Sequence, residues 1–132
     1  MDQTTLVIEQ IEAGHELVDR FDRFAPLAAA FWLRRVESSQ WSLYLVSDQI
    51  TTANLLSGYS EMVRLIGELR NPELSLLRVK LVPLDSALAR DALEACRYYP
   101  TRRIVDLGVK LLGDLPVEEA YFYPLPACVP TK

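Results

Sequence analysis

Hydrophobic residues between positions 28 and 47 follow the pattern of a β-hairpin that is apolar on both faces. The segments Ala28–Val36 and Trp41–Ser47 flank a polar connection. A four-residue connection would pair Arg34 with Leu43 and Trp32 with Leu45. Side chains alternate between the two faces of a strand, so Trp32 and Trp41 share one face, and Phe31 and Tyr44 lie on the other. A sheet with one wet face would alternate apolar and polar residues. We therefore expect this sheet to be covered on both faces, by helices or by a second copy of the chain.

Three other segments carry apolar residues at intervals of three and four, which is typical of one helix face. They run from Thr4 or Thr5 to about Phe24, from Thr51 or Thr52 to about Arg70, and from an N-cap at Asp85 to Tyr99. A proline closely follows each of these segments, and proline does not continue a helix. We therefore predict three helices.

The remaining apolar segments indicate three more strands, over Leu74–Leu84, Arg103–Leu112 and Val117–Tyr123. The element order is then α-β-β-α-β-α-β-β. Hairpins near both ends favour a mainly antiparallel sheet, and a strand-helix-strand connection can add one parallel pair. The sequence therefore predicts an α+β fold with a five-stranded, mainly antiparallel sheet and three helices. We expect one domain over residues 1–125 and a proline-rich tail over 126–132.

Several of these segments resemble an uncharacterised family of small bacterial proteins. The resemblance lies in Ala30-Phe31-Trp32, in Trp41–Ser47 and in Ala120-Tyr121-Phe122-Tyr123-Pro124. These match the ordered patterns A-F-W, W-x-L-Y-x-x-S and A-Y-x-Y-P, and the resemblance covers roughly residues 5–125. The part between the third helix and the final hairpin is shorter here. The motifs belong to strand cores, and the resemblance implies a bacterial cytosolic protein and no specific activity.

Composition and charge narrow the class of protein. The 132 residues carry a net charge of −4, which disfavours nucleic acid and anionic membranes because both attract a positive surface; a local basic patch would be an exception. No stretch approaches the roughly 20 apolar residues of a membrane span, and residues 1–5 do not resemble a secretory signal. Cys96 and Cys128 make no disulfide framework. We therefore expect two reduced thiols, a cytoplasmic location and no membrane contact.

Motifs for catalysis and cofactor binding are missing from the sequence. His15 is the single histidine, neither H-E-x-x-H nor C-x-x-C occurs, and the five glycines form no phosphate-binding loop. We therefore assign no catalytic residue, metal or cofactor, and we expect a protein that is not an enzyme. One alternative is a Mg²⁺-dependent hydrolase that would bring Asp48, Asp106 and Glu119 together.

Arginine and tyrosine residues form the most suggestive polar cluster. Arginine is suited to carboxylate and phosphate, and tyrosine adds a stacking face and a hydroxyl. Such a cluster fits a small anionic ligand or nucleic acid, although cations at a helix C-terminus also favour the helix dipole. Arg34 shares a face with the tryptophans and needs an acidic partner, an aromatic ring or solvent. The predicted ligand-binding residues are Arg34, Arg97, Tyr98, Arg102 and Arg103.

Three functions follow from these observations, in order of preference. The first is a non-enzymatic protein-interaction module that forms a homodimer, because the apolar hairpin needs cover. Its predicted interface residues are Phe31, Trp32, Trp41 and Tyr44. The second is a binder of a small anionic ligand or nucleic acid through the Arg/Tyr cluster. The third is the carboxylate hydrolase.

Overall fold

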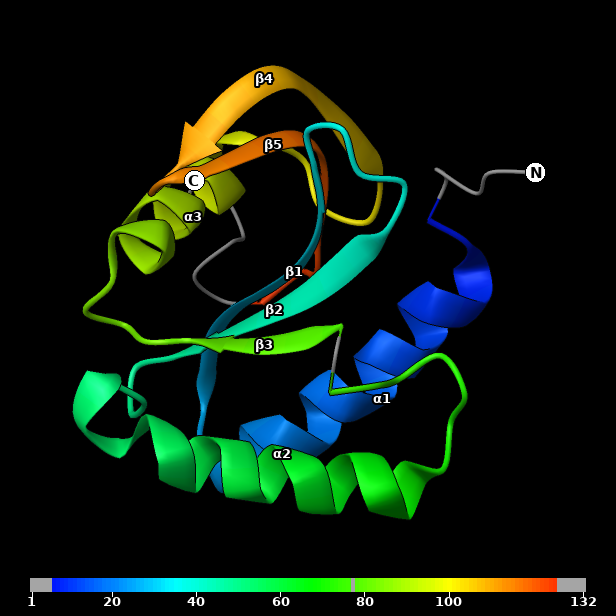
Figure 1. The fold of residues 1–132 in the computed structure, drawn as a ribbon, viewed down its shortest axis with the longest axis vertical. Helices are drawn as coiled ribbons and strands as arrows, with labels where there is room; N and C mark the ends of the chain where they lie inside the picture. The colour runs from blue at the N-terminus through cyan, green and yellow to red at the C-terminus, as the bar shows by residue number, and fades with distance from the viewer. Residues whose placement is uncertain (1–5, 77, 126–132) are drawn as a thin grey trace.

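The computed structural model of the protein describes residues 6–76 and 78–125, which form three α-helices and a five-stranded sheet (Figure 1). A short 3₁₀ turn (Thr52–Asn54) precedes the second helix. The elements in chain order are α1 (Ile8–Phe24), β1 (Leu27–Arg35), β2 (Trp41–Ser47), α2 (Leu55–Leu69), β3 (Val79–Val82), α3 (Ala87–Tyr98), β4 (Ile104–Leu112) and β5 (Leu115–Phe122).

The sheet has the strand order β3-β2-β1-β5-β4. β2 and β3 are parallel, and every other neighbouring pair is antiparallel. The parallel pair arises because α2 connects β2 to β3 and returns the chain to the same end of the sheet. The predicted α+β class, element order and mainly antiparallel sheet are confirmed.

The β1–β2 hairpin has a register that differs by two residues from the predicted one. Arg34 lies opposite Trp41, and Trp32 lies opposite Leu43, so the connection is longer than four residues. A shift of two keeps every side chain on its face, because the period of a strand is two. The tryptophans therefore still share one face, and Phe31 and Tyr44 still share the other.

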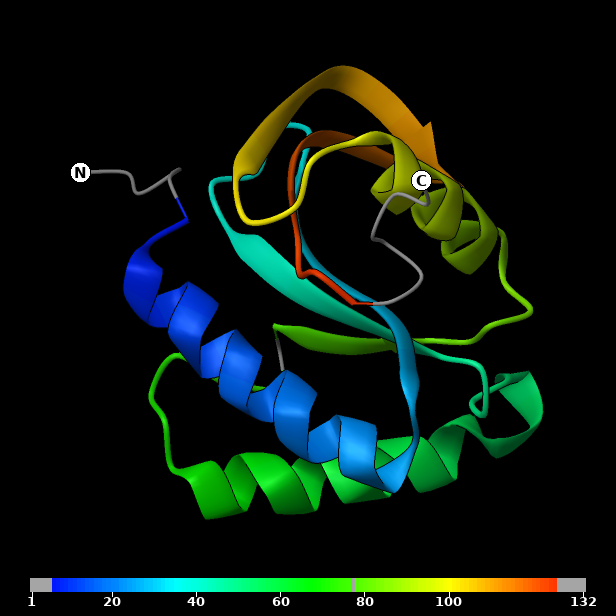
Figure 2. The same cartoon turned by 180° about the vertical axis from the view of Figure 1, so that it is seen from behind.

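Both faces of the sheet are covered by helices of the same chain. Figures 1 and 2 show α1 and α2 side by side on one face, and α3 on the other face beneath the curled β4–β5 hairpin. The core between the sheet and α1 and α2 contains Trp32 and Trp41. The core on the α3 side contains Phe31 and Tyr44. The apolar faces of the β1–β2 hairpin are thus buried by helices of the same chain.

Several boundaries differ from the sequence predictions, and the last strand, for example, covers Leu115–Phe122 instead of Val117–Tyr123. β3 covers only Val79–Val82, and the residues from Leu74 to Leu76 lie in a turn and loop, where Leu74 N–H donates to Asn71 O. The α3 N-cap is Ser86, whose Oγ accepts from Ala89 N–H at 3.1 Å, instead of Asp85. At the start of α1, Val7 N–H donates to Gln10 Oε1; the predicted caps Thr4 and Thr5 lie outside the described residues, as does the tail over 126–132.

Bulges bend the β4–β5 hairpin. The β1–β5 register moves from Arg34 opposite Glu119 to Arg35 opposite Val117, which leaves Glu118 as an extra residue. On β4, the register with β5 is interrupted between Asp106 and Lys110, where Gly108 has a φ of 72°. Bulges increase strand twist and redirect side chains.

Candidate functional site

The four predicted interface residues do not reach the surface. Phe31 and Trp32 are 0% exposed, Trp41 is 2% exposed and Tyr44 is 6% exposed. All of them pack against helices of their own chain. The apolar hairpin therefore gives no argument for a second copy, and an interaction surface has to be sought elsewhere on the molecule.

Arg34 pairs with two acidic residues of the neighbouring strand β5. Its Nε donates to Glu119 Oε1 at 2.9 Å, and its Nη1 donates to Glu118 Oε1 at 3.0 Å and to Ser38 O at 3.0 Å. The β5 bulge makes this possible, because it brings two successive glutamates within reach of one guanidinium. Burial lowers the Arg34 pKa, but the hydrogen bonds and charges of the two glutamates outweigh it and raise the pKa. Arg34 is thus already paired within the protein.

The other predicted ligand-binding residues lie in two places. Arg97 and Tyr98 end α3, and Tyr98 is 82% exposed. Arg102 and Arg103 precede β4 and are exposed. Of the predicted set, Arg102 alone lines the hollow beside α1. The structure therefore does not gather the five residues into one anion site.

The three carboxylates of the hydrolase hypothesis are also separated. Asp106 lies opposite Glu119 in the β4–β5 register. Asp48 follows Ser47, which lies at the other end of the hairpin from Arg34, the β1 partner of Glu119. At about 3.3 Å per strand residue this separates Asp48 from Glu119 by roughly 20 Å. Among the described residues no group of three or more acidic, histidine or cysteine side chains is arranged to hold a metal ion.

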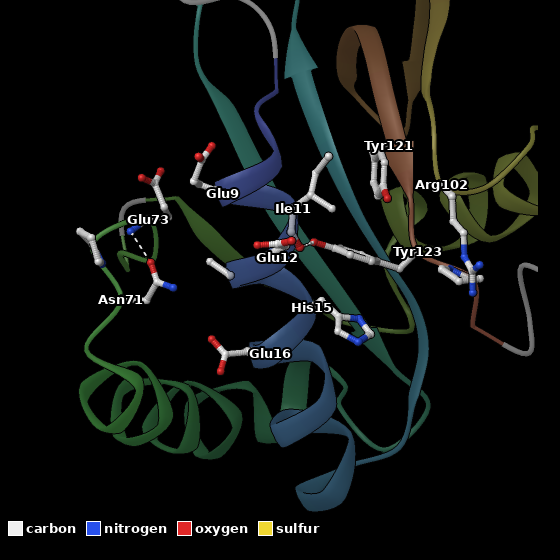
Figure 3. Close-up of a pocket in the computed structure, with 13 residues that line it drawn as sticks. Glu9, Ile11, Glu12, His15, Glu16, Asn71, Glu73, Arg102, Tyr121 and Tyr123 are labelled. Carbon is white, nitrogen blue, oxygen red and sulfur yellow. Dashed lines mark hydrogen bonds between the residues drawn. The ribbon is translucent and has the colours of Figure 1, made fainter.

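A hollow of about 690 Å³ lies alongside α1, and we call it the α1 groove. Figure 3 shows Tyr121, Tyr123 and Arg102 on one side of α1, and Asn71 and Glu73 on the other. Arg102 stands at the rim with a φ of 65°, a left-handed conformation that is uncommon outside glycine. The lining residues are Glu9, Ile11, Glu12, Ala13, His15, Glu16, Asn71, Pro72, Glu73, Arg102, Tyr121, Tyr123 and Pro124.

The floor of the α1 groove is a buried hydrogen-bond chain. Trp32 Nε1–H donates to Tyr123 Oη at 2.9 Å, and Tyr123 Oη–H donates to Ile11 O at 2.6 Å. Burial raises the pKa of Tyr123 far above its ordinary value, although the Trp32 hydrogen bond opposes this effect. Burial also raises the pKa of Tyr121, and the positive charge of Arg102 opposes it. Both phenols are therefore protonated at neutral pH and act as hydrogen-bonding groups.

A second surface, which we call the α3–β4 surface, lies at the outer edge of the sheet. It consists of Tyr98, Val109 and Leu111, together with a hollow of about 700 Å³ that Tyr98, Lys110 and Leu111 help to line. Tyr98 is 82% exposed, Val109 69% and Leu111 62%. Val109 and Leu111 are two large exposed apolar side chains on one edge strand, and Tyr98 is exposed at the end of the neighbouring helix; exposed apolar side chains that lie together mark interaction surfaces.

Sequence reasoning missed parts of both surfaces. Glu9, Glu12 and Glu16 follow helical spacing, and that pattern equally fits an ordinary solvated helix face. Only the fold brings Glu73 and Arg102 to the same groove. On β4, Val109 and Leu111 are exposed, and the bulge between Asp106 and Lys110 precedes Leu111.

The structure also corrects the expectation of two reduced thiols. Cys96 is buried on the α3 side and is disulfide-bonded; Cys128 lies outside the described residues. No helix in the described ranges has the length and apolar character that crossing a membrane requires. Compared with protein-family models, curated proteins and solved structures, the chain matches none of them, so the resemblance to small bacterial proteins stays a prediction.

Proposed function

We propose that the protein is a non-enzymatic protein-interaction module that forms a homodimer, and that its docking surface is the α3–β4 surface. The observation that carries this proposal is the exposure of Val109 and Leu111 on β4, which is an edge strand of the sheet. Burying exposed apolar side chains contributes about 25 cal/mol per Å² to association. A partner strand would also satisfy the outward backbone groups of β4.

A matched pair of variants tests this proposal. Leu111→Asp places a charge on the α3–β4 surface, whereas Val63→Asp places one on the outer face of α2, where Val63 is 50% exposed. We expect sedimentation equilibrium to show a dimer of the wild-type chain that Leu111→Asp weakens and Val63→Asp leaves intact. Equal behaviour of the two variants would contradict the choice of surface.

The α1 groove supports a second candidate function, the binding of a small charged molecule. Arg102 forms no ion pair with any other described residue, and Tyr121 stands beside it. Four glutamates line the same groove, so a simple anion such as phosphate is repelled. A molecule that carries both an amine and a carboxylate fits this mixture of charges better, because each of its charges finds an opposite one.

Small probes separate these possibilities. 6-Aminohexanoate carries both charges, whereas hexanoate and hexylamine carry one each. We expect 6-aminohexanoate alone to shift the amide resonances of the groove residues, and Arg102→Gln to abolish the shifts. Arg103→Gln, a neighbouring exposed arginine outside the groove lining, is the control. Equal shifts with hexanoate would restore the anion-binding prediction.

A cytoplasmic location is the compartment we propose from the composition. The disulfide at Cys96 opposes this proposal, because disulfides are rare in reducing compartments. Thiol titration of denatured protein, isolated from cells with thiols blocked at lysis, tests it directly. Two free thiols per chain support the cytoplasm, and none supports an oxidising compartment.

A further inference from the structure

We infer that the partner is a second copy whose β4 pairs antiparallel with β4 across a two-fold axis, so that two five-stranded sheets become one continuous sheet. This inference rests on the proposed function and adds the pairing and its register. An isologous contact of this kind closes on itself and limits the assembly to a dimer.

The two edges of the sheet differ in how open they are. β3 is four residues long, and its Leu81 N–H donates to Tyr59 Oη at 3.0 Å, so a side chain already occupies that edge. β4 is nine residues long, and β5 is its only strand neighbour among the described residues. A side chain also accepts one N–H on this strand, since Gly108 N–H donates to Asp106 Oδ1 at 2.9 Å, but this hydrogen bond lies inside the bulge, between the two arms. Strand addition therefore favours the β4 edge.

The bulge in β4 selects the partner. It divides the strand into two arms, Ile104–Asp106 and Lys110–Leu112, each of which pairs residue by residue with β5. A bulge and an edge lysine discourage pairing with an arbitrary regular strand. A second β4 placed around a two-fold axis carries the same interruption at the same place, so the first arm of one copy meets the second arm of the other.

The faces of the sheet restrict the register. Residues opposite each other in a ladder must lie on the same face. Asp106 lies opposite Glu119, which pairs with Arg34 on the face that α1 covers. Lys110 lies opposite Val117, which belongs to the core on the α3 side. Asp106 therefore cannot meet Lys110 of the partner subunit, although their charges are opposite.

A register that satisfies the faces also brings one pair of opposite charges close together, and it sets Asp106 opposite Leu111 of the partner subunit. Val105 lies opposite Ala120, and both Ala120 and Leu112 belong to the core on the α3 side. When Val105 faces Leu112 of the partner subunit, Arg103 comes next to the two-residue turn that follows Leu112 of the partner subunit, and Asp114 belongs to this turn. Arg103 and Asp114 are exposed, and neither forms an ion pair with another described residue. The two-fold axis produces this ion pair twice.

Charge reversal tests the register. We expect Arg103→Asp and Asp114→Arg each to raise the dimer dissociation constant about tenfold, because each places like charges opposite one another twice. The double variant Arg103→Asp/Asp114→Arg restores the constant to within about threefold of wild type, because the pair is re-formed with its signs exchanged. A second pair for comparison is Asp106→Lys with Lys110→Asp, for which the double variant gives no such recovery, because this register keeps the two residues apart and because Asp106→Lys also removes the acceptor of Gly108 N–H in the bulge. Sedimentation equilibrium measures all six variants and the wild type.

The outcomes separate this inference from the function on which it rests. A dimer that Leu111→Asp weakens, but that the Arg103/Asp114 double variant does not restore, overturns the register and leaves the docking surface standing. If the Asp106→Lys/Lys110→Asp double variant recovers the wild-type dissociation constant, that result also overturns the register. A wild-type chain that stays monomeric up to about 100 µM, where a dimer of micromolar affinity is populated, overturns both the second copy and the proposed homodimer.

Discussion

Trp32 and Tyr123 lie 91 residues apart in the sequence and are joined by a buried hydrogen bond of 2.9 Å. The same Tyr123 hydroxyl donates to Ile11 O in α1. One phenol therefore links the centre of β1, the end of the last strand segment and the first turns of α1. No buried side-chain nitrogen or oxygen of the described residues is left without a partner. The desolvation of the Tyr123 hydroxyl in the core is therefore compensated by its hydrogen bonds.

Removing the Tyr123 hydroxyl tests that link. Tyr123→Phe keeps the ring but leaves Trp32 Nε1–H without its acceptor, and an unsatisfied buried donor costs about 1–3 kcal/mol. We expect the free energy of unfolding in urea to fall by that amount. Tyr98→Phe is the control, because Tyr98 is 82% exposed and its hydroxyl reaches water in either state. An equal loss in both variants would contradict the role of the buried hydroxyl.

Gly14 makes the contact between α1 and Tyr123 possible. A Cβ at this position would lie 2.3 Å from Tyr123 Oη and 3.0 Å from Trp32 Nε1. Gly14→Ala gains helix propensity, yet we expect a net destabilisation of about 1–3 kcal/mol from overpacking. Gly67→Ala in α2, where nothing lies within 4 Å of the added Cβ, is expected to stabilise by about 0.5–1 kcal/mol. Thermal unfolding of the two variants should therefore shift in opposite directions.

Periodicity explains why much of the fold could be predicted. Alternation in β1 and β2 identified which side chains share a face. The predicted register was wrong by two residues, but the assignment of faces is correct because a shift of two keeps each side chain on its face. The loop length was not readable from the pattern, so the register itself was wrong. The apolar residues Leu74 and Leu76 extended the predicted third strand, whereas the chain turns there before β3 begins.

The sites were harder to predict because they depend on which elements become neighbours. Arg34 needed a partner, and the sequence indicated this, but a bulge at Glu118 decides that two glutamates of β5 supply it. The α1 groove joins residues from α1, from the loop around Asn71, from the turn before β4 and from the end of β5 with the residues after it. No local pattern connects such distant segments, since strand order is a property of the whole chain.

The Arg34 cluster gives a stability prediction with an internal control. Arg34→Met leaves Glu118 and Glu119 side by side and only 35% and 27% exposed, so we expect a loss of about 1–3 kcal/mol in the free energy of unfolding. Arg34→Lys recovers only part, because an ammonium lacks the fork that reaches both carboxylates. Adding Glu118→Gln and Glu119→Gln to Arg34→Met should recover stability by removing the repulsion. A loss that persists unchanged in that triple variant would assign the effect to packing.

Glu61 gives a prediction for the dependence of stability on pH. A hydrogen bond from the Arg64 guanidinium lowers the pKa of Glu61 below the ordinary value of a glutamate. Arg64 also pairs with Glu68, which reaches Arg20 of α1 at 3.7 Å. Because the folded pKa is the lower one, the unfolded chain binds the proton more readily on acidification. The stabilising contribution of Glu61 is therefore complete above the unfolded pKa and is lost as the pH falls through the folded pKa.

Glu61→Gln removes this titration. We expect the difference in free energy of unfolding between wild type and Glu61→Gln to be in favour of wild type at pH 7 and to shrink between pH 5 and pH 3. The effect is small, since the pair lies near the surface, so urea unfolding has to be measured on both proteins at each pH. Glu16→Gln on α1 is the control, because Glu16 is exposed and forms no ion pair with the described residues. A gap between wild type and Glu61→Gln that stays constant across this pH range would show that the Arg64 hydrogen bond does not stabilise the fold through the charge of Glu61.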